Sequence, residues 1–344
     1  MVAPVHIESF LSMDGVCLTR LCDIRQAAAE AYASRYGVKQ VSTDYREVLA
    51  AKDVDCISIC TDHASHAQIA IDALEAGKHV LCEKALAASA DDLQAMRSAA
   101  ARYPNQVFSG VFQHRFDPVY GLVKQWVEQG RFGTLLTAGV QMRCQRTDAY
   151  YQADDWRGTW AKEGGSVLMN QAIHYLDILA WVVGRVDSLC GTYANRTHKD
   201  SIETEDTAVA IMRFANGTLG TVEASCSSLL HWDPMFFVHG TDGLIEVRKD
   251  QATRIEFEDP EVNALARHSF SSAADVEHLP GKSYYGTGHR ALLTDFIEAV
   301  REGREPFVTA ASACVAADLA MAIYQSHHQN KWVTLPNNDE TMEK

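Results

Sequence analysis

Two stretches of this 344-residue chain carry side chains in patterns that suit proton and hydride chemistry. The run from His79 to Lys84 ends an apolar, strand-like segment on a Glu-Lys pair. A lysine at such a strand end can hydrogen-bond a substrate oxygen and stabilise an alkoxide as charge develops. Further on, Asn170, His174 and Asp177 follow i, i+4, i+7 spacing, which predicts one polar stripe on an otherwise apolar helix. A neutral His174 could take the proton of a substrate hydroxyl while hydride leaves the same carbon.

Each pattern also has a simpler structural interpretation. The Glu83-Lys84 pair could be a surface ion pair at a strand end, and His174 could be a histidine with satisfied hydrogen bonds in the core. Metal binding by the helix stripe is the weaker alternative, because the stripe has no second histidine and asparagine is a poor zinc ligand. We expect no metal.

The elements that must position these residues change character along the chain. From Val16 to Phe112, short apolar runs alternate with helical stretches, which predicts an α/β fold with a doubly wound, Rossmann-type parallel sheet. Ligands of such sheets bind at the carboxyl ends of the strands, where the sequence places Asp23, Thr61 to His66 and Lys84. Asp23 could accept the ribose hydroxyls of NAD, or cap the helix that follows, and the two roles are compatible. Arg25 is the feature that could favour NADP instead, by pairing with its 2′-phosphate.

After Asp117-Pro118 the pattern predicts an α+β domain with a large antiparallel sheet. A helix is expected from about Ser166 to Val183, and hairpin turns at Asn216-Gly217 and Asp242-Gly243. Two late helices, 291–302 and 311–328, are expected to close this second domain. The predicted division is 1–115 for the dinucleotide-binding domain, 116–336 for the substrate and oligomerisation domain, and 337–344 for a polar tail.

Composition excludes several classes of protein. The chain has 31 Lys+Arg against 45 Asp+Glu, a net charge of −14, which argues against a phosphate-backbone grip on nucleic acid and against anionic membrane surfaces. No apolar run is long enough to span a membrane, and the first residues do not resemble a signal peptide. The nine cysteines form no C-x-x-C pair, as expected for reduced thiols. We therefore expect a cytoplasmic protein.

Several motifs together resemble the Gfo/Idh/MocA family of NAD(P)-dependent sugar and polyol dehydrogenases, over nearly the whole chain. The stretch Glu75 to Ala85 is similar to the family's EAGKHVLCEKP motif, and Thr61 to His66 to its T-P-x-x-x-H loop. Trp156 to Trp160 and Gly164 to Asp177 resemble its W-R-G-T-W and G-G-G-x-L-x-(D/N)-x-x-x-H-x-x-D motifs.

The resemblance implies an oxidoreductase that moves hydride between a nicotinamide, NAD or possibly NADP, and a carbinol carbon of a sugar, polyol or sugar derivative. It implies that Lys84 is the catalytic lysine and His174 the acid/base. The full set of expected site residues has three groups: catalytic Lys84, His174 and Asp177; cofactor-binding Asp23, Arg25, Thr61, His63, His66, Glu83, Lys84, Trp156 and Arg157; and substrate-binding Arg115, Asn170, Gln171 and His174. We also expect a homodimer or homotetramer formed through the C-terminal sheet.

Two other functions are compatible with the family. One is an NAD-dependent glycosidase, which oxidises its substrate transiently and releases an aglycone without net NADH. The other is a non-catalytic, dinucleotide-sensing regulator. Retention of Lys84 and His174 argues against a regulator, because a sensor need not keep a proton relay.

Three departures from the family pattern stand out. Ala85 replaces the proline after the lysine, Asn170 replaces an acidic residue, and the glycine-rich loop is absent, since Val2 to His6 already matches the start of the helix that follows it. We expect a chain shortened at its N-terminus that lacks the first strand of the sheet, with the segments 16–22 and 54–61 facing a gap. The competing expectation is a genuine short form in which those two strands pair directly.

Overall fold

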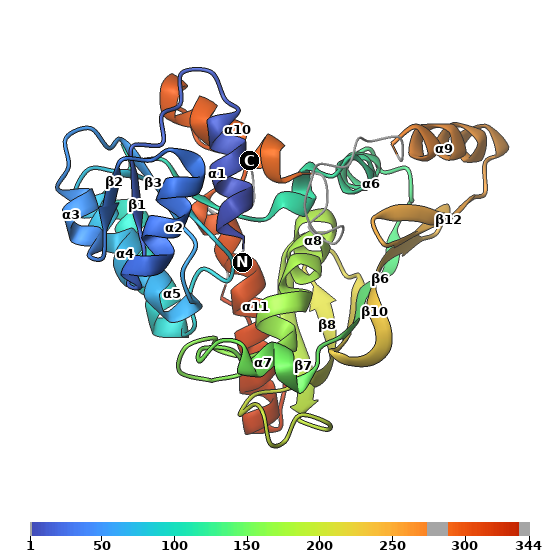
Figure 1. Ribbon diagram of the computed structural model, residues 1–344. Coiled ribbons are helices and arrows are strands. Elements are labelled where there is room, and N and C mark those ends of the chain that lie inside the picture. Colours follow the sequence, from blue (N-terminus) through green and yellow to red (C-terminus); the bar gives the residue numbers. More distant parts are fainter. Residues whose placement is uncertain (1, 274–287, 337–344) are drawn as a thin grey trace.

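The computed structural model describes residues 2–273 and 288–336. The expected tail, 337–344, lies outside the described residues. Alternating strands and helices make up the N-terminal part of the chain, and a large sheet with helices on one side makes up the C-terminal part (Figure 1).

The parallel strands of the N-terminal part form two separate pieces. One piece pairs β1 (Arg20–Cys22) with β2 (Gln40–Ser42), and the other has the order β3 (Cys56–Ile59), β4 (His79–Cys82), β5 (Phe108–Gly110). Strands β1 and β3 are not paired with each other, so direct pairing of these two segments does not occur. The associated helices are α1 (Ala3–Leu11), α2 (Gln26–Tyr36), α3 (Tyr45–Leu49), α4 (His63–Glu75) and α5 (Ala90–Arg102).

Local signals in the sequence explain where these helices begin. Asp62 caps α4 by accepting a hydrogen bond from Ser65 N, and Ser89 caps α5 by accepting one from Asp92 N. The Ser89 and Asp92 side chains are also joined directly, because Ser89 Oγ donates to Asp92 Oδ2 at 2.7 Å. The helix expected to begin near Val2 to His6 is α1.

The C-terminal part is built on an eight-stranded sheet in the order β12-β11-β10-β6-β9-β8-β7-β13. Its strands are β6 (Leu135–Gln145), β7 (Val186–Ala194), β8 (Thr207–Phe214), β9 (Leu219–Ser225), β10 (Ser227–Gly240), β11 (Gly243–Arg248), β12 (Gln251–Phe257) and β13 (Val333–Thr334). The expected large antiparallel sheet is confirmed, with one parallel pair, β6 and β9. The Asn216-Gly217 turn between β8 and β9 is confirmed, with Gly217 at φ 89°. Between β10 and β11 the turn lies at Thr241-Asp242, one residue earlier than expected.

The helical elements of this part are η1 (Gln113–Phe116), α6 (Pro118–Glu128), α7 (Asp148–Gln152), η2 (Val167–Ala172), α8 (Ile173–Val183), α9 (Pro260–Ser272), α10 (His289–Glu302) and α11 (Ala310–Gln329). The two late helices do more than close the second domain. Helix α10 packs on α1, and α11 packs on α5 and β5 as well as on α8 and β7 (Figure 1). Because α11 joins both parts, we keep the division between residues 115 and 116 as a proposal.

Candidate active site

The segment that precedes α8 packs closely on the loop after Lys84 and on α11, and a buried carboxylate holds its first turn. A Cβ at Gly164, which has φ 77°, would lie 2.3 Å from the carbonyl oxygen of Ala88, and one at Gly165 would lie 2.1 Å from the Tyr324 hydroxyl oxygen. Only glycine therefore allows this close approach. The first turn that follows is anchored by buried Glu205, which accepts hydrogen bonds from Ser166 N at 3.1 Å and from Leu168 N at 2.9 Å.

Residues Val167–Ala172 form a π-helical turn before α8 begins, and this turn changes the predicted polar stripe. Asn170 faces the Lys84 loop: Lys84 Nζ donates to the Asn170 backbone oxygen and to Oδ1, both at 2.8 Å. Asp177, by contrast, points to Arg115. The three residues of the stripe therefore do not meet in one cluster.

Lys84 lies in a hydrogen-bonded chain that ends on a buried carboxyl group. Asn170 Nδ2 donates to Glu163, and Glu163 also accepts from Gly158 N. Burial raises the pKa of Glu163 to about 7, although these hydrogen bonds and the Lys84 charge oppose the shift. Burial lowers the pKa of Lys84 to about 8, against the opposing charges of Glu83 and Glu163. Lys84 is thus an ammonium at neutral pH that gives up its proton far more readily than a lysine in water.

His174 is partly buried and lies beside aromatic rings. Its ring centroid is 6.1 Å from that of Phe112 and 5.2 Å from that of His114. Nδ1 is buried with no hydrogen-bond partner among the described residues, so Nε2 is the accessible ring nitrogen. Burial lowers the pKa of His174 well below its usual value, and the charges of Lys84, His114 and His289 lower it further. The imidazole is therefore neutral at pH 7.

Two residues expected to act on substrate are engaged with each other instead. Arg115 Nε and Nη2 donate to the Asp177 carboxylate at 2.8 and 2.5 Å, and Arg115 also donates to Ser312 Oγ and the Ser312 backbone oxygen. Their side chains are 5% and 1% exposed, so this is a buried bidentate pair. Asp177 lies one turn after His174 on α8, and its carboxylate is bound to Arg115; contact of Arg115 with substrate and a catalytic role for Asp177 remain predictions. Gln171 is buried, and its Oε1 has no partner in the described part of the chain.

The expected cofactor residues separate into accessible and internal ones. Asp23, Arg25 and Thr61 follow β1 and β3 and are partly or fully exposed. Asp23 accepts from Arg25 N at 2.8 Å and does not cap α2, whose N-cap is Arg25. Glu83 is internal: it is buried and accepts from His6 Nε2 at 2.9 Å, and it makes no ion pair with Lys84 within residues 2–273 and 288–336.

The two histidines of α4 have different surroundings from those expected. His66 is fully buried, with Nδ1 2.8 Å from Ala85 O and Nε2 3.2 Å from Thr61 O, and its contact with a dinucleotide remains a prediction. His63 lies 2.8 Å from Glu163 O through Nδ1, and its ring is 5.3 Å from that of Trp156. Trp156 is therefore tied to the start of α4, the edge at which a dinucleotide is expected.

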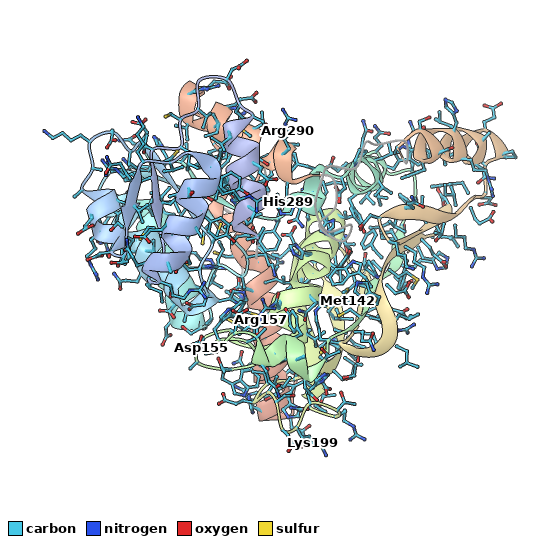
Figure 2. All side chains as sticks on the ribbon, viewed as in Figure 1. Met142, Asp155, Arg157, Lys199, His289 and Arg290 are labelled. Atoms are coloured by element: carbon cyan, nitrogen blue, oxygen red, sulfur yellow. The ribbon has the colours of Figure 1, made fainter. Side chains whose placement is uncertain are left out.

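Arg157 adds a second positive charge near Lys84 and His63. Its Nε donates to Asp154 Oδ2 at 2.8 Å, and its guanidinium lies 4.2 Å from the Tyr150 ring centroid. Figure 2 shows Arg157 and His289 where the N-terminal and C-terminal parts of the chain meet. Sequence reasoning did not assign roles to Glu163, His6, His114 or His289; of these, Glu163 stands directly before the Gly164-Gly165 pair and could have been noticed there.

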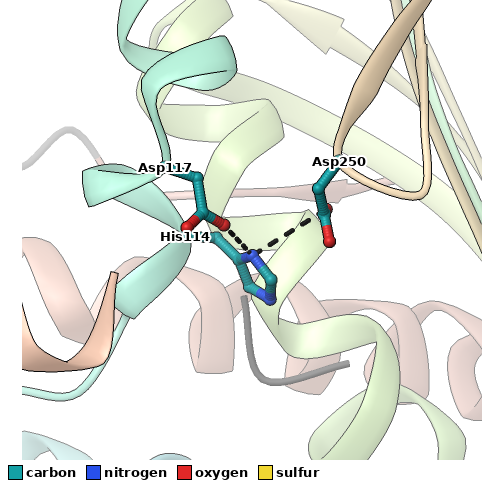
Figure 3. Close-up of side chains that lie close together, drawn as sticks. All are labelled: His114, Asp117 and Asp250. Atoms are coloured by element: carbon teal, nitrogen blue, oxygen red, sulfur yellow. Dashed lines mark hydrogen bonds and ion pairs between the residues drawn. The ribbon is translucent and has the colours of Figure 1, made fainter. Parts of the chain in front are cut away.

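One group of side chains has the composition of a metal site. His114, Asp117 and Asp250 each offer one ligand atom, and these atoms lie within 4.8 Å of one another (Figure 3). His114 Nδ1 is 2.6 Å from Asp117 Oδ2, however, and because a carboxylate only accepts, this nitrogen carries a proton. A metal ion at this position would have to displace that proton.

Comparison with known proteins places this geometry among dehydrogenases. Residues 1–111 match the GFO_IDH_MocA description "Oxidoreductase family, NAD-binding Rossmann fold", and residues 124–335 match "Oxidoreductase family, C-terminal alpha/beta domain". A levoglucosan dehydrogenase of Pseudarthrobacter phenanthrenivorans is 26% identical, covering 90% of this chain and 87% of the relative. A myo-inositol 2-dehydrogenase of Thermotoga maritima is 23% identical, covering 97% of this chain and 96% of the relative.

Among solved structures, the WlbA dehydrogenase from Bordetella pertussis in complex with NADH and UDP-GlcNAcA has a TM-score of 0.87. It is 27% identical, covering 98% of this chain and 95% of that one. A levoglucosan dehydrogenase in complex with NADH and levoglucosan has a TM-score of 0.81 at 23% identity, which shows the same fold over 97% of this chain and 96% of that one.

Proposed function

This chain belongs to the Gfo/Idh/MocA family of oxidoreductases, and from that premise we propose that it oxidises or reduces a carbinol carbon of a sugar, polyol or sugar derivative. The observation that carries the proposal is the pairing of a cationic Lys84 with a neutral His174. Lys84 is bound to Asn170, and His174 lies four residues further along the same helical segment. A positive donor and a neutral acceptor at one substrate oxygen are what alcohol oxidation requires.

The roles of the two residues follow from their protonation states. His174 Nε2 accepts the proton of the substrate hydroxyl, and the Lys84 ammonium stabilises the negative charge that develops on that oxygen. Asn170 positions Lys84 through its two oxygens, and Glu163 fixes the Asn170 amide. The nicotinamide, when bound, accepts the hydride.

The residues present fit a dinucleotide at the carboxyl edge of β1, β3 and β4. Asp23 is a partly exposed carboxylate at the end of β1, and its Oδ2, which accepts no hydrogen bond from residues 2–273 or 288–336, could accept ribose hydroxyls. Thr61 is exposed at the end of β3. His63, Trp156 and Arg157 lie on the side of this edge that faces Lys84.

We expect NAD to be preferred over NADP. Replacement of Asp23 by Ala removes the carboxylate that repels a 2′-phosphate and leaves Arg25 to pair with it. The ratio of kcat/KM for NADP to that for NAD should therefore rise about tenfold or more in Asp23→Ala. Glu30→Ala, an exposed change on α2, should leave the ratio unchanged. A wild-type preference for NADP would show that Arg25 decides cofactor choice.

We expect a basic limb near pH 8 in the pH profile of kcat/KM. Burial lowers the pKa of Lys84 to about 8, so the ammonium is present below that pH and is lost above it. Activity should fall as pH rises through 8, and Lys84→Arg, which stays charged, should remove that limb even if its activity is low. A limb that persists in Lys84→Arg would assign it to another group.

A screen of sugars and polyols with NAD and with NADP tests the function itself. Formation of NADH from one class of substrate supports a dehydrogenase. Release of an aglycone from a glycoside without net NADH would identify a glycosidase instead, and NAD binding without turnover of any substrate would favour a regulator.

We propose that the protein forms homodimers or homotetramers through the open face of its large sheet. Helices α8 and α11 contact the opposite side. The open face carries Val209, Ile211 and Leu219, which are 45%, 52% and 56% exposed, a concentration of apolar surface that favours association.

The nine free thiols support a reducing, cytoplasmic location, and none of the described helices is long and apolar enough to cross a membrane.

Ile211→Glu should convert the assembly to monomers, because it places a charge in the middle of this apolar surface. Light scattering coupled to size-exclusion chromatography measures the mass directly. Leu265→Glu, at a similarly exposed position on α9, is the matched control and should keep the wild-type mass. An unchanged mass for Ile211→Glu would exclude this face as the interface.

A further inference from the structure

We propose that His114, held as an imidazolium by Asp117 and Asp250, is a positioning residue whose charge adds to burial and to Lys84 in keeping the neighbouring His174 neutral, the state in which it can accept a substrate proton. This inference rests on the proposed function for its catalytic meaning. Its physical content, a fixed positive charge that controls the protonation of His174, rests on contacts within the chain.

Two carboxylates from distant parts of the sequence hold the His114 proton. Asp117 precedes α6, and its Oδ2 lies 2.6 Å from His114 Nδ1. Asp250 stands in the turn between β11 and β12, with its Oδ1 3.9 Å from the same nitrogen (Figure 3). All three residues are largely withdrawn from water, with side chains 2%, 4% and 20% exposed, so the ion pairs are only weakly screened.

Asp250 is itself held in place. Tyr120 donates to Asp250 Oδ1 at 2.8 Å, and Tyr175 donates to the same oxygen at 3.4 Å. Both hydroxyls stabilise the ionised carboxylate, which in turn stabilises the charged ring of His114. Burial lowers the pKa of His114, but Asp250 and Asp117 outweigh it and raise the pKa to about 9.

His114 is in direct contact with His174. The two ring centroids are 5.2 Å apart with an interplanar angle of 79°, and His114 packs against Tyr175 of the same helix at 5.5 Å. Two imidazolium ions at this separation inside the protein would repel each other, so the charge on His114 disfavours a charge on His174. Burial is the largest cause of the lowered pKa of His174, and the charges of Lys84 and His289 act in the same direction as the charge of His114.

Within residues 2–273 and 288–336, His174 has no carboxylate beside its ring, whereas His114 has two, and this difference favours the charge on His114. No carboxylate contacts the His174 ring among the described residues, and its Nδ1 has no partner. Each ring has one buried nitrogen without a partner in the described part of the chain, Nδ1 of His174 and Nε2 of His114, so a second proton is costly on either ring unless a carboxylate offsets the charge. Of the two rings, only that of His114 has such carboxylates beside it, those of Asp117 and Asp250. The nearest acid along the helix, Asp177, is already paired with Arg115. The proton thus resides on His114 and not on His174.

Titration of histidine Cε1 resonances by NMR on the full chain tests this assignment without cofactor or substrate. Single His→Gln variants assign the two signals. In the wild type we expect His114 to be charged at pH 7 and His174 to be neutral. In His114→Gln the pKa of His174 should rise by on the order of one unit. Asp250→Asn, a change of nearly constant volume, should lower the pKa of His114 by a similar amount.

His198→Gln is the matched control, because His198 is a second buried histidine, 3.3 Å from Asp206, outside this cluster. It should leave the titration of His174 unchanged. An unchanged His174 pKa in His114→Gln, or a neutral His114 at pH 7 in the wild type, would overturn the proposal. So would stoichiometric binding of Zn²⁺ that Asp250→Asn abolishes, since the cluster would then be a metal site.

The proposed function and the coupling between His114 and His174 can be contradicted independently of each other. A protein that oxidises no sugar but whose His174 responds to loss of His114 would contradict the proposed function and leave the electrostatic coupling established. A protein that turns over sugars while His174 ignores His114 would retain the function and reject this inference.

Discussion

His174→Ala and Lys84→Ala are each expected to lower kcat by on the order of 10²-fold or more, with little change in affinity for the dinucleotide. The first variant removes the acceptor of the substrate proton, and the second removes the charge that stabilises the resulting alkoxide. Steady-state NADH absorbance measures kcat on a substrate found in the screen, and quenching of tryptophan fluorescence measures cofactor affinity.

His268→Ala and Lys331→Ala are the corresponding controls, because both side chains are exposed and lie outside the site. They should retain wild-type kcat. Near-normal turnover in His174→Ala would remove this residue from the mechanism, and a loss of cofactor affinity equal to the loss of kcat would point to misplacement of the cofactor instead of lost proton transfer.

Asp177→Ala is expected to reduce the free energy of unfolding by about 3–5 kcal/mol, the cost of leaving a buried charge without its partner. Among the described residues, Arg115, whose side chain is 5% exposed, would then have only Ser312 as a hydrogen-bond partner. Urea unfolding followed by circular dichroism measures the loss. Glu298→Ala, an exposed change on α10, should stay within about 0.5 kcal/mol of the wild type.

The double variant Arg115→Met, Asp177→Leu separates structure from catalysis. Removal of both charges leaves nothing unpaired and should restore much of the stability lost in Asp177→Ala. If Asp177→Ala instead unfolds like the wild type and loses kcat, Asp177 belongs to the catalytic machinery as the sequence suggested.

Local patterns predicted most of the secondary structure. The alternation of apolar runs and helices from Val16 to Phe112 predicted the parallel strands. Ser89 caps α5 and Gly217 forms the β8–β9 turn, and both effects depend on residues close in sequence. The parallel pairing of β6 with β9 could not be foreseen, because it joins residues about 80 positions apart along the chain. Hairpin pairs can be predicted from the turn residues that connect them, but β6 and β9 are not connected by a turn.

The site shows the same division between local and distant effects. Lys84, Asn170 and His174 were found because their neighbours in sequence form recognisable motifs. The stripe argument placed Asp177 with them, but it did not predict that the Asp177 carboxylate would pair with Arg115 of η1, 62 positions earlier in the chain. The link from His114 to Asp250 spans more than 130 residues and depends on the β11–β12 turn, so periodicity gives no indication of it.

The position of α11 has a consequence for how the chain acquires its structure during synthesis. This helix covers α5 and β5 of the N-terminal part, and Ser109 pairs with Thr309 just before it begins. The N-terminal part leaves the ribosome first, yet this apolar face has no cover until residues 310–329 have also emerged. The early part of the chain therefore completes its core late, and over that interval its exposed surface is a natural target for chaperones.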